Sequence, residues 1–386
     1  MKKRVLVVGA GLVGMCTALR LAQAGVQVVL ADQAKPATGA SWAAAGMLAP
    51  AYEAAHEPEA HADLFELCMA GADIWRDFAP WLQAYSDTSL DYFGMGTLAC
   101  AVNAEQVIRL DRLEEACRER EVPVRRLTGK RARAIDASLS SALESALLLP
   151  TDQQIDNWAA IGALMSALAK AGVQLLPDTP VKHLHRYENG WRVRGVGDFD
   201  RIVWTAGVGT KESVYVDGEL TQLVDEGCII PVKGQMLAVD PILGAPEKVL
   251  RFGAGYIAPK STRIVIGATS EWGVSDKIVQ DSDILALKNA AAEICPILAE
   301  ADVKMSWAGV RPGTIDHAPI IGWSKVEGIA VAAGHYRNGI LLSPLTADII
   351  VKLLLEQELS TLEQKFSLGR FQRSVPAEST SEKVLP

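Results

Sequence analysis

The first thirty residues switch between short apolar runs and a helical pattern. "VLVV" (5–8) is a continuous apolar run of the kind found in buried parallel strands. "LVGMCTALRLAQAG" (12–25) repeats its apolar positions with helical spacing, and "VQVVLAD" (26–32) is a second apolar run. A strand, a helix and a strand in this order form one βαβ unit. The pattern therefore predicts the first half of a doubly wound parallel sheet.

The rest of the chain divides into two kinds of segment. Helical spacing over 57–81 and 158–171, with short strands within 173–207, continues the α/β pattern. Alternating strands dominate two other stretches, with charged helices near 104–120 and 281–297. These strands are "GTLACAV" (96–102), "GCIIPVKGQMLAV" (227–239), "YIAPK" (256–260) and "RIVIGAT" (263–269).

Sequence order and domain order are therefore expected to differ. We predict an α/β fold in which a Rossmann-like nucleotide-binding domain carries an inserted α+β substrate domain built on an antiparallel sheet. The nucleotide-binding domain is assigned to 1–85, 151–221 and 315–373, and the substrate domain to 86–150 and 222–314. The polar end, "SVPAESTSEKVLP" (374–386), is predicted to be a flexible tail.

Composition narrows the class of protein. A net charge of -8 argues against nucleic acid or an anionic membrane as a partner. Six cysteines without a CxxC pair fit a reducing compartment. The basic and apolar start resembles a secretory signal, but glycines 9, 11 and 14 do not suit one. No apolar run approaches the ~20 residues of a bilayer span. We therefore expect a soluble, cytoplasmic protein without a transmembrane segment.

The motif "GAGLVG" (9–14) joins the first strand to the first helix. In this motif Gly9 permits the tight turn, Gly11 lets the backbone approach a pyrophosphate, and Gly14 lets helix and strand pack closely. Asp32 ends the second strand, where it can accept hydrogen bonds from a ribose. The combination predicts a dinucleotide site but does not separate FAD from NAD.

Three further segments are rich in small residues or carry an unexplained arginine. "GASWAAAGMLAP" (39–50) can lie flat against a large planar group, with Ser41 offered to a phosphate; a flexible linker is the alternative. Arg311 in "WAGVRPGT" is framed for bidentate capture of a carboxylate, or else pairs with Asp316. Arg337 lies in the polar middle of "AAGHYRNGILLSP" (332–344), whose flanks are apolar.

Histidines do not suggest a metal or an acid–base centre. His183 and His185 have strand spacing without a cysteine or acidic partner, and His317 is expected in a loop. No metal site and no catalytic side-chain group are predicted, so a bound cofactor is expected to carry any redox chemistry.

Taken together, these motifs resemble the FAD-dependent amine oxidases of the D-amino acid oxidase superfamily, most closely the thiamine-pathway glycine oxidases. The resemblance runs from "VVGAGLVG" and "SWAAAGML" through "DQQIDN", "TPVKHL", "PVKGQ", "YIAPK" and "IVIGAT" to "WAGVRPGT" and "AAGHYRNGILLSP". It implies an FAD-binding domain, a homo-oligomer and a noncovalent cofactor, because no cysteine follows Cys295 in the segment where relatives attach their flavin.

The resemblance also implies site residues. Arg311 corresponds to a carboxylate clamp, Tyr256 to a second carboxylate ligand, and Arg337 to a residue between flavin and substrate. Ala49 corresponds to a pocket position. With the glycine motif, the expected FAD contacts are Gly9, Gly11, Leu12, Val13, Gly14, Asp32, Gln33, Ala40, Ser41, Ala45, Gly46, Met47, Val181, His335, Tyr336, Arg337, Asn338, Gly339, Ile340 and Leu341.

Three positions depart from the family pattern. Glycine oxidases tend to have Gly at Ala49, Met at Ser270 and His at Ala254, and these positions shape the side-chain end of the pocket. The substrate therefore stays open among glycine, sarcosine, D-alanine and D-proline.

The implied activity is oxidation of a small amino acid by hydride transfer from its α-carbon to the flavin. Hydrolysis of the imino acid then yields the oxo acid and ammonia, and dioxygen, the expected acceptor, becomes hydrogen peroxide. Three alternatives remain: a D-amino acid or D-hydroxyproline dehydrogenase that reduces a quinone, a non-catalytic FAD-carrying subunit, and an NAD dehydrogenase. The last leaves "SWAAAGM" and "GHYRNG" unexplained.

Overall fold

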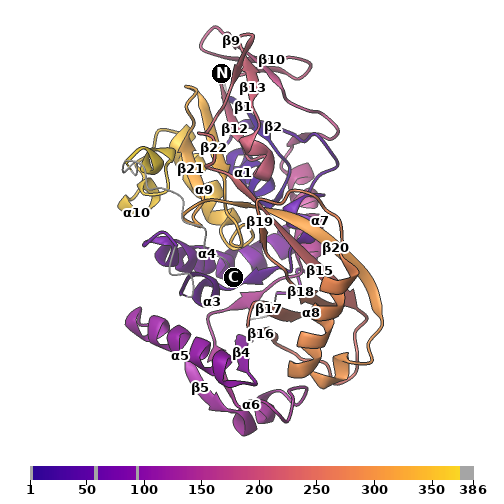
Figure 1. Cartoon of the computed structure of the whole chain (residues 1–386). Coiled ribbons are helices and arrows are strands. Elements are labelled where there is room, and N and C mark those ends of the chain that lie inside the picture. The colour runs from indigo at the N-terminus through magenta and orange to yellow at the C-terminus, as the bar shows by residue number, and fades with distance from the viewer. Residues whose placement is uncertain (1–2, 56–59, 93–94, 374–386) are drawn as a thin grey trace.

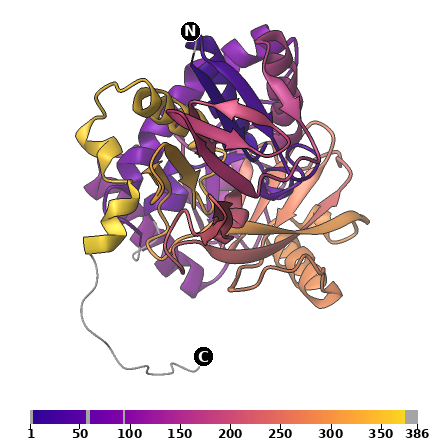
Figure 2. The same cartoon turned by 90° about the horizontal axis from the view of Figure 1, so that it is seen from above.

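The computed structural model describes residues 3–55, 60–92 and 95–373. Within these residues the chain forms two large sheets, one of six and one of nine strands. The six-stranded sheet lies in the upper half of Figure 1 with the indigo amino-terminal unit, and the nine-stranded sheet lies in the lower half. Figure 2 shows the two halves from above.

The six-stranded sheet has the topology of a nucleotide-binding fold. Its strands lie in the order β21-β22-β12-β1-β2-β8, and every pair is parallel except β21 with β22. The strands are β21 (Ile320–Trp323), β22 (Ile329–Ala333), β12 (Arg201–Trp204), β1 (Arg4–Val8), β2 (Gln27–Ala31) and β8 (Gln174–Leu176). The predicted βαβ unit is confirmed, because α1 (Leu12–Gln23) connects the parallel strands β1 and β2.

Helices cover one face of this sheet. The helix α1 packs against α9 (Ser343–Leu354) and α7 (Asn157–Lys170), and α4 packs on both α7 and α9. We predicted a helix over 57–81, whereas α4 spans Leu64–Ser86; residues 57–59 lie outside the described part. The helix continues past 81 because its apolar face extends through the buried Leu82.

A smaller sheet covers the opposite face. Its strands are β11 (Gly197–Phe199), β10 (Gly190–Val193), β9 (His183–Tyr187), β13 (Val214–Val216) and β14 (Glu219–Thr221). Trp191 and Val214 of this sheet share a hydrophobic core with Leu6 and Val8 of β1. The nucleotide-binding half therefore has three layers.

The nine-stranded sheet is mostly antiparallel. Its strands follow the order β19-β15-β18-β17-β16-β4-β6-β5, with β20 paired to β15, and only β16 with β4 is parallel. They are β19 (Glu271–Trp272), β15 (Ile230–Val239), β18 (Ile264–Gly267), β17 (Gly255–Pro259), β16 (Val249–Phe252), β4 (Thr97–Ala101), β6 (Ser145–Leu149), β5 (Arg125–Thr128) and β20 (Val303–Gly313).

The two faces of this sheet have different partners. One face buries a core shared with α6 (Gly129–Ile135), α8 (Asp281–Ile294) and the short helix η2 (Pro296–Leu298). The other face presents Met236, Tyr256 and Trp307 to Ala43 of the nucleotide-binding half. Helix α5 (Ala104–Glu119) packs against β4. The side chains that face the first half are therefore those available to line a site between the halves.

The sheet memberships agree with the predicted α/β fold class. Strands from 97–149 and 230–313 build the second sheet, although they are separated by 150–229 in the sequence. The domain limits themselves stay a prediction, and the predicted tail, 374–386, lies outside the described residues.

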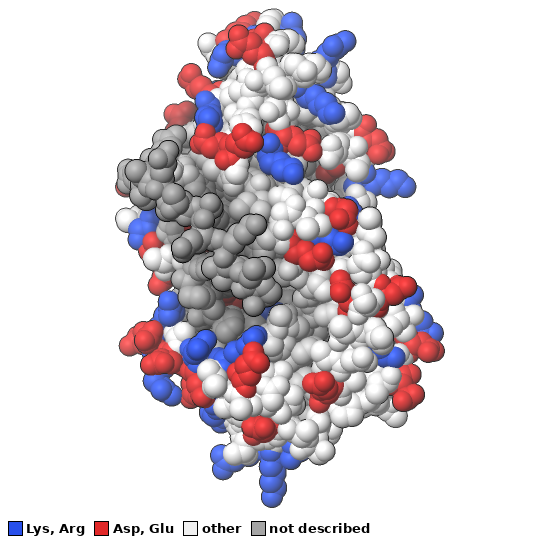
Figure 3. Space-filling model, viewed as in Figure 1, with Lys and Arg blue, Asp and Glu red and all other residues white. Residues whose placement is uncertain are grey.

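Within the described ranges, none of the helices has the length and apolar character needed to cross a bilayer. On the face seen in Figure 3, acidic and basic side chains are interspersed.

Candidate active site

A cavity of about 610 Å³ lies between the two halves. Its walls come from the β1–α1 turn, the segment after β2, the loops after β12 and β22, and strands β15, β16, β17 and β20. A ligand bound there would contact both the nucleotide-binding half and the second sheet.

The glycine turn forms one end of the cavity. Gly9 has φ +104°, and a Cβ there would lie 2.6 Å from the Thr205 carbonyl oxygen. Helix α1 begins at Leu12; its N-cap residue, Gly11, offers no side-chain cap, and its first turn has no acidic residue. A helix amino terminus of this kind attracts a phosphate through free N–H groups and its dipole.

Asp32 and Ser41 both contact this turn. The Asp32 carboxylate accepts hydrogen bonds from the backbone N–H of Ala10 (2.7 Å) and of Ala34 (2.9 Å). A carboxylate has about four acceptor positions, so two remain for a ribose. The Ser41 hydroxyl accepts from the N–H of Leu12 at 2.9 Å and thereby ties the following segment to the helix.

The small-residue segment is folded rather than a flexible linker. Residues Ala40–Ala43 form α2, and Met47–Leu48 form β3, which pairs with β7 (Gln153–Gln154). Position 46 requires a glycine, because a Cβ there would lie 2.0 Å from the Ile155 carbonyl oxygen. The linker alternative is therefore wrong.

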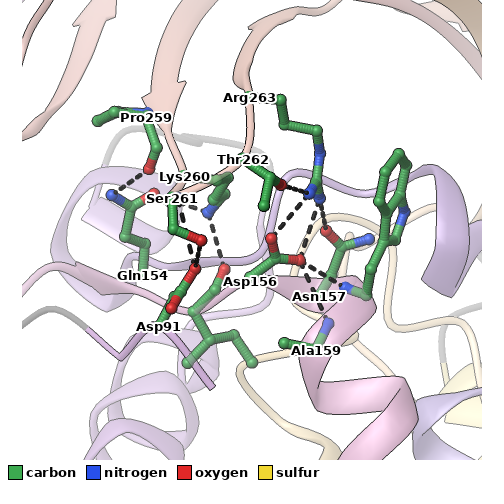
Figure 4. A network of polar contacts seen from close by, with 12 residues as sticks. Asp91, Gln154, Asp156, Asn157, Ala159, Pro259, Lys260, Ser261, Thr262 and Arg263 are labelled. Carbon is green, nitrogen blue, oxygen red and sulfur yellow. Dashed lines mark hydrogen bonds and ion pairs between the residues drawn. The ribbon is translucent and has the colours of Figure 1, made fainter. Parts of the chain in front are cut away.

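A buried polar network holds this segment from behind (Figure 4). The Asn157 amide donates to the carbonyl oxygens of Ser41 (3.0 Å) and Trp42 (2.9 Å). Arg263 in turn forms a bidentate ion pair with Asp156, at 2.7 and 3.0 Å. The β17–β18 turn of the second half thus fixes a loop that lines the cavity.

Lys260 belongs to the same network and is fully buried. Its ammonium donates to the Gln154 side-chain oxygen and the Ile155 carbonyl, both at 2.7 Å. Burial lowers the pKa of Lys260 to about 7, because these neutral acceptors do not compensate for lost hydration.

The segment after β22 forms another part of the cavity wall. His335 to Ile340 all line the cavity, and His335 Nε2 lies 2.9 Å from the Thr346 hydroxyl. Burial lowers the pKa of His335 to about 3, so this imidazole is neutral. The polar middle of the motif thus faces the cavity, whereas Leu342 is completely buried.

Most sequence-predicted site residues meet at the cavity. Two of the predicted cofactor contacts do not line it. Gly14 packs against the turn, since a Cβ there would lie 1.9 Å from the Gly9 carbonyl oxygen, and the Leu341 carbonyl accepts from Trp75. The predicted residues that do line it are Gly9, Gly11, Leu12, Val13, Asp32, Gln33, Ala40, Ser41, Ala45, Gly46, Met47, Ala49, Val181, Tyr256, Arg311, His335, Tyr336, Arg337, Asn338, Gly339 and Ile340.

The cavity suits a large aromatic cofactor with hydrogen-bonding edges. Three buried polar atoms in residues of its wall have no protein partner among the described residues: Asn338 Oδ1, an acceptor, and Trp204 Nε1 and Arg251 Nε, both donors. Buried polar groups of this kind are normally satisfied by a ligand or water. Together with the glycine turn, which attracts a phosphate, these unpaired polar atoms make the residues of the cavity wall suitable for binding FAD.

Arg311 lies on the second-sheet wall. Its guanidinium donates to the Thr269 carbonyl at 3.2 Å, and among the described residues it makes no ion pair. The alternative partner, Asp316, instead pairs with Arg370 at 2.7 Å. Burial lowers the pKa of Arg311 below its ordinary value. A positive charge on the cavity wall without an ion-pair partner among the described residues can bind the carboxylate of a ligand.

Tyr256 reaches across the neighbouring strand. It lies opposite Gly267 on β18, where a Cβ would lie 2.5 Å from the Tyr256 hydroxyl. Burial raises the pKa of Tyr256 to about 12, so its hydroxyl is a hydrogen-bond donor at neutral pH. Arg311 and Tyr256 therefore offer donors from the same face of the sheet.

The residues that line the cavity but were not predicted from the sequence include a charged pair, Glu53 and Arg251. They form a buried ion pair at 2.5 Å, and Glu53 also lies 3.4 Å from Arg337. Burial alone would raise the pKa of Glu53, but Arg251 and Arg337 hold it below its ordinary value. No local motif marks either residue, since they are 198 positions apart.

The three positions that depart from the family pattern do not all lie at the cavity. Ala49 and Ala254 line the cavity, whereas Ser270 is exposed and is not among the lining residues. The expectation that Ser270 shapes the pocket is therefore wrong.

Comparisons with known proteins find relatives that match nearly the whole chain. Glycine oxidase from Geobacillus kaustophilus is 30% identical over 95% of this chain and 96% of its own. Its crystal structure matches with a TM-score of 0.84 and covers 96% of this chain and 99% of that one. The bifunctional protein ThiO/ThiG of Trichormus variabilis is 29% identical over 97% of this chain, which spans 56% of that protein.

A family model described as FAD dependent oxidoreductase matches residues 4–353. This match covers nearly all of both halves of the fold and confirms the predicted family, fold class and FAD cofactor. The chain belongs to the FAD-dependent oxidoreductase family that includes the glycine oxidases.

Proposed function

We propose that the protein oxidises a small amino acid to its imino acid, which water hydrolyses to the oxo acid and ammonia, with dioxygen as the electron acceptor. The observation that carries the proposal is Arg311, a cavity arginine without an ion-pair partner among the described residues. The substrate carboxylate supplies that partner. Homo-oligomeric assembly and a cytoplasmic location stay predictions.

The protein's own contribution is to position the substrate. Arg311 binds the carboxylate with two parallel hydrogen bonds, and the Tyr256 hydroxyl donates a third. This arrangement directs the α-carbon toward the wall formed by residues 335–340. When bound noncovalently there, FAD supplies the redox chemistry by accepting a hydride from the α-carbon. Fixing the reacting atoms in this way is the main catalytic effect expected of the side chains.

The test is anaerobic titration of the purified holoenzyme. Glycine, sarcosine, D-alanine, D-proline and D-aspartate are added separately while the flavin absorbance is recorded. The proposal predicts that at least one bleaches the flavin and that air restores the oxidised spectrum with release of hydrogen peroxide. A flavin reduced by dithionite but by none of these amino acids would contradict the proposal. If a quinone but not air reoxidised the reduced flavin, the electron acceptor would be a quinone instead of dioxygen.

A further inference from the structure

Arg263 lies behind residues 40–47, hereafter the cavity loop, which line the cavity with the exception of Trp42. It ends the β17–β18 turn of the second half, directly before β18. Its guanidinium forms the bidentate pair with Asp156, and its Nη2 also donates to the Asn157 side-chain oxygen at 3.3 Å (Figure 4). Arg263 is 7% exposed and is not a lining residue, so it can affect a ligand only through its neighbours.

The contact with Arg263 determines which way the Asn157 amide faces. A guanidinium can only donate hydrogen bonds, so the amide oxygen of Asn157 faces Arg263 and the amide nitrogen faces away from it. That nitrogen donates to the carbonyl oxygens of Ser41 and Trp42, at 3.0 and 2.9 Å. With the amide reversed, its oxygen would face two carbonyl oxygens, and both hydrogen bonds to the cavity loop would be lost.

Arg263 also contacts a second donor to the cavity loop, Trp158. The guanidinium carbon lies 3.5 Å from the centroid of the Trp158 ring, which is a cation–π contact. The Trp158 indole N–H donates to the Trp42 carbonyl oxygen at 2.9 Å, and the two indole rings stack with centroids 5.3 Å apart. One buried guanidinium therefore orients two side chains that donate to the same backbone carbonyl.

The same turn reaches the other end of the cavity loop through Lys260. The Lys260 amino group donates to the Ile155 carbonyl oxygen at 2.7 Å, and the Ile155 N–H donates to the Gly46 carbonyl oxygen at 2.8 Å. Gly46 lines the cavity. The turn therefore holds the cavity loop at both of its ends, through Lys260 at Gly46 and through Arg263 at the start of the loop.

We infer that Arg263 is a positioning residue for the cofactor, which orients Asn157 and Trp158 so that they hold the cavity loop in the conformation that binds FAD. The inference rests on the FAD cofactor and goes beyond the proposed function, because it applies to every substrate. A purely structural role, in which Arg263 only balances the charge of Asp156, requires neither the contact with the Asn157 oxygen nor the one with the Trp158 ring.

The first test measures the Kd of FAD by dialysis of the holoenzyme against graded FAD concentrations, with bound flavin read from its absorbance. We expect Arg263→Met to raise this Kd by about 10- to 100-fold, the range of a hydrogen bond to a charged group. Arg192→Met is the matched control and should keep the wild-type Kd. Arg192 also forms a bidentate pair, with Asp198 at 2.8 and 2.9 Å, and lies over the Tyr187 ring, but it is not a cavity neighbour. An unchanged Kd in Arg263→Met, with or without a lower Tm, overturns the inference.

A double-mutant cycle tests whether Arg263 acts through Asn157. Asn157→Ala removes the amide that donates to the cavity loop and should also raise the Kd of FAD. Because both substitutions break the same chain of contacts, the double variant should bind FAD no more than about twofold more weakly than the weaker-binding single variant. Effects on log Kd that simply add would show that the two residues act independently, which overturns the inference.

A further measurement does not depend on a folded variant. Backbone hydrogen exchange of the wild-type protein is compared with FAD bound and after FAD has been removed. We expect FAD to slow exchange both in the cavity loop and in the turn at 259–263, because a contact that strengthens FAD binding is itself strengthened by FAD. Unchanged exchange in the turn overturns the inference. It leaves the proposed function standing, since no substrate takes part in the measurement.

Discussion

The guanidinium of Arg311 lies directly over the backbone of Gly234 on the neighbouring strand. A Cβ on Gly234 would lie 2.4 Å from both terminal nitrogens of Arg311. Gly234 pairs with Gly309 in the β15–β20 ladder, so the floor beneath the clamp consists of backbone. The position of the proposed carboxylate ligand therefore depends on a glycine that touches no substrate itself.

Gly234→Ala should displace the clamp without unfolding the protein. The clash is with the far end of a flexible side chain, so Arg311 moves and its bidentate geometry is lost. We expect KM for the amino acid to rise about tenfold, as for one weakened charged hydrogen bond. Gly162→Ala is the matched control, since a Cβ there meets nothing within 4 Å. Unchanged KM in Gly234→Ala would separate Arg311 from substrate binding.

Removing the guanidinium should have a larger effect. Arg311→Met leaves the substrate carboxylate buried without its counter-charge, which costs about 3–5 kcal/mol, or roughly two to four powers of ten in kcat/KM. Arg311→Lys should lie between the two, because lysine restores charge but not the two-point geometry. Steady-state kinetics measures kcat/KM for both variants. A kcat/KM of Arg311→Met close to that of the wild type would contradict this prediction.

Tyr256→Phe should be milder. The change removes one neutral donor to the carboxylate, worth about 1 kcal/mol, or roughly a fivefold loss of kcat/KM. Because burial raises the pKa of Tyr256 to about 12, its ionisation should not lower wild-type kcat/KM below pH 10. Full insensitivity of kcat/KM to the substitution would place the hydroxyl outside the substrate site.

The lowered pKa of Lys260 leads us to predict that the stability of the protein depends on pH. Burial lowers its pKa from 10.5 to about 7, so between these values the unfolded chain binds more protons than the folded one. The contribution of Lys260 to the free energy of unfolding is therefore lowest below pH 7 and rises as the pH increases toward 10. The Tm of Lys260→Met relative to wild type should fall over that range. A pH-independent difference in Tm would show that the lysine is charged in the folded protein.

Local patterns predicted the nucleotide-binding half well. The glycine turn, Asp32 and the βαβ unit lie within 5–32, where spacing alone determines geometry. The clamp at Arg311 was identified from its rigid frame and from resemblance. Both limits of α4 were misplaced, because the helix begins at Leu64, directly after its N-cap residue Asp63, and continues to Ser86.

Long-range pairs could not be predicted in the same way. Glu53 and Arg251 meet only because β16 is brought against α3 (Pro50–Ala55), and nothing in either segment specifies the other. The same holds for Arg311 and Gly234, whose contact depends on the register of β15 with β20. These residues line the cavity or lie beneath its wall, so local sequence patterns indicated the family better than the details of the site.

The most direct test of the account is whether flavin reduction requires a carboxylate at Arg311. Anaerobic reduction rates of the holoenzyme are measured with D-alanine and with ethylamine, which lacks only the carboxylate, in wild type and in Arg311→Met. We predict that D-alanine reduces wild type faster by about two powers of ten or more and that the variant loses this difference. Equal rates in wild type, or a difference that survives in Arg311→Met, would contradict the account.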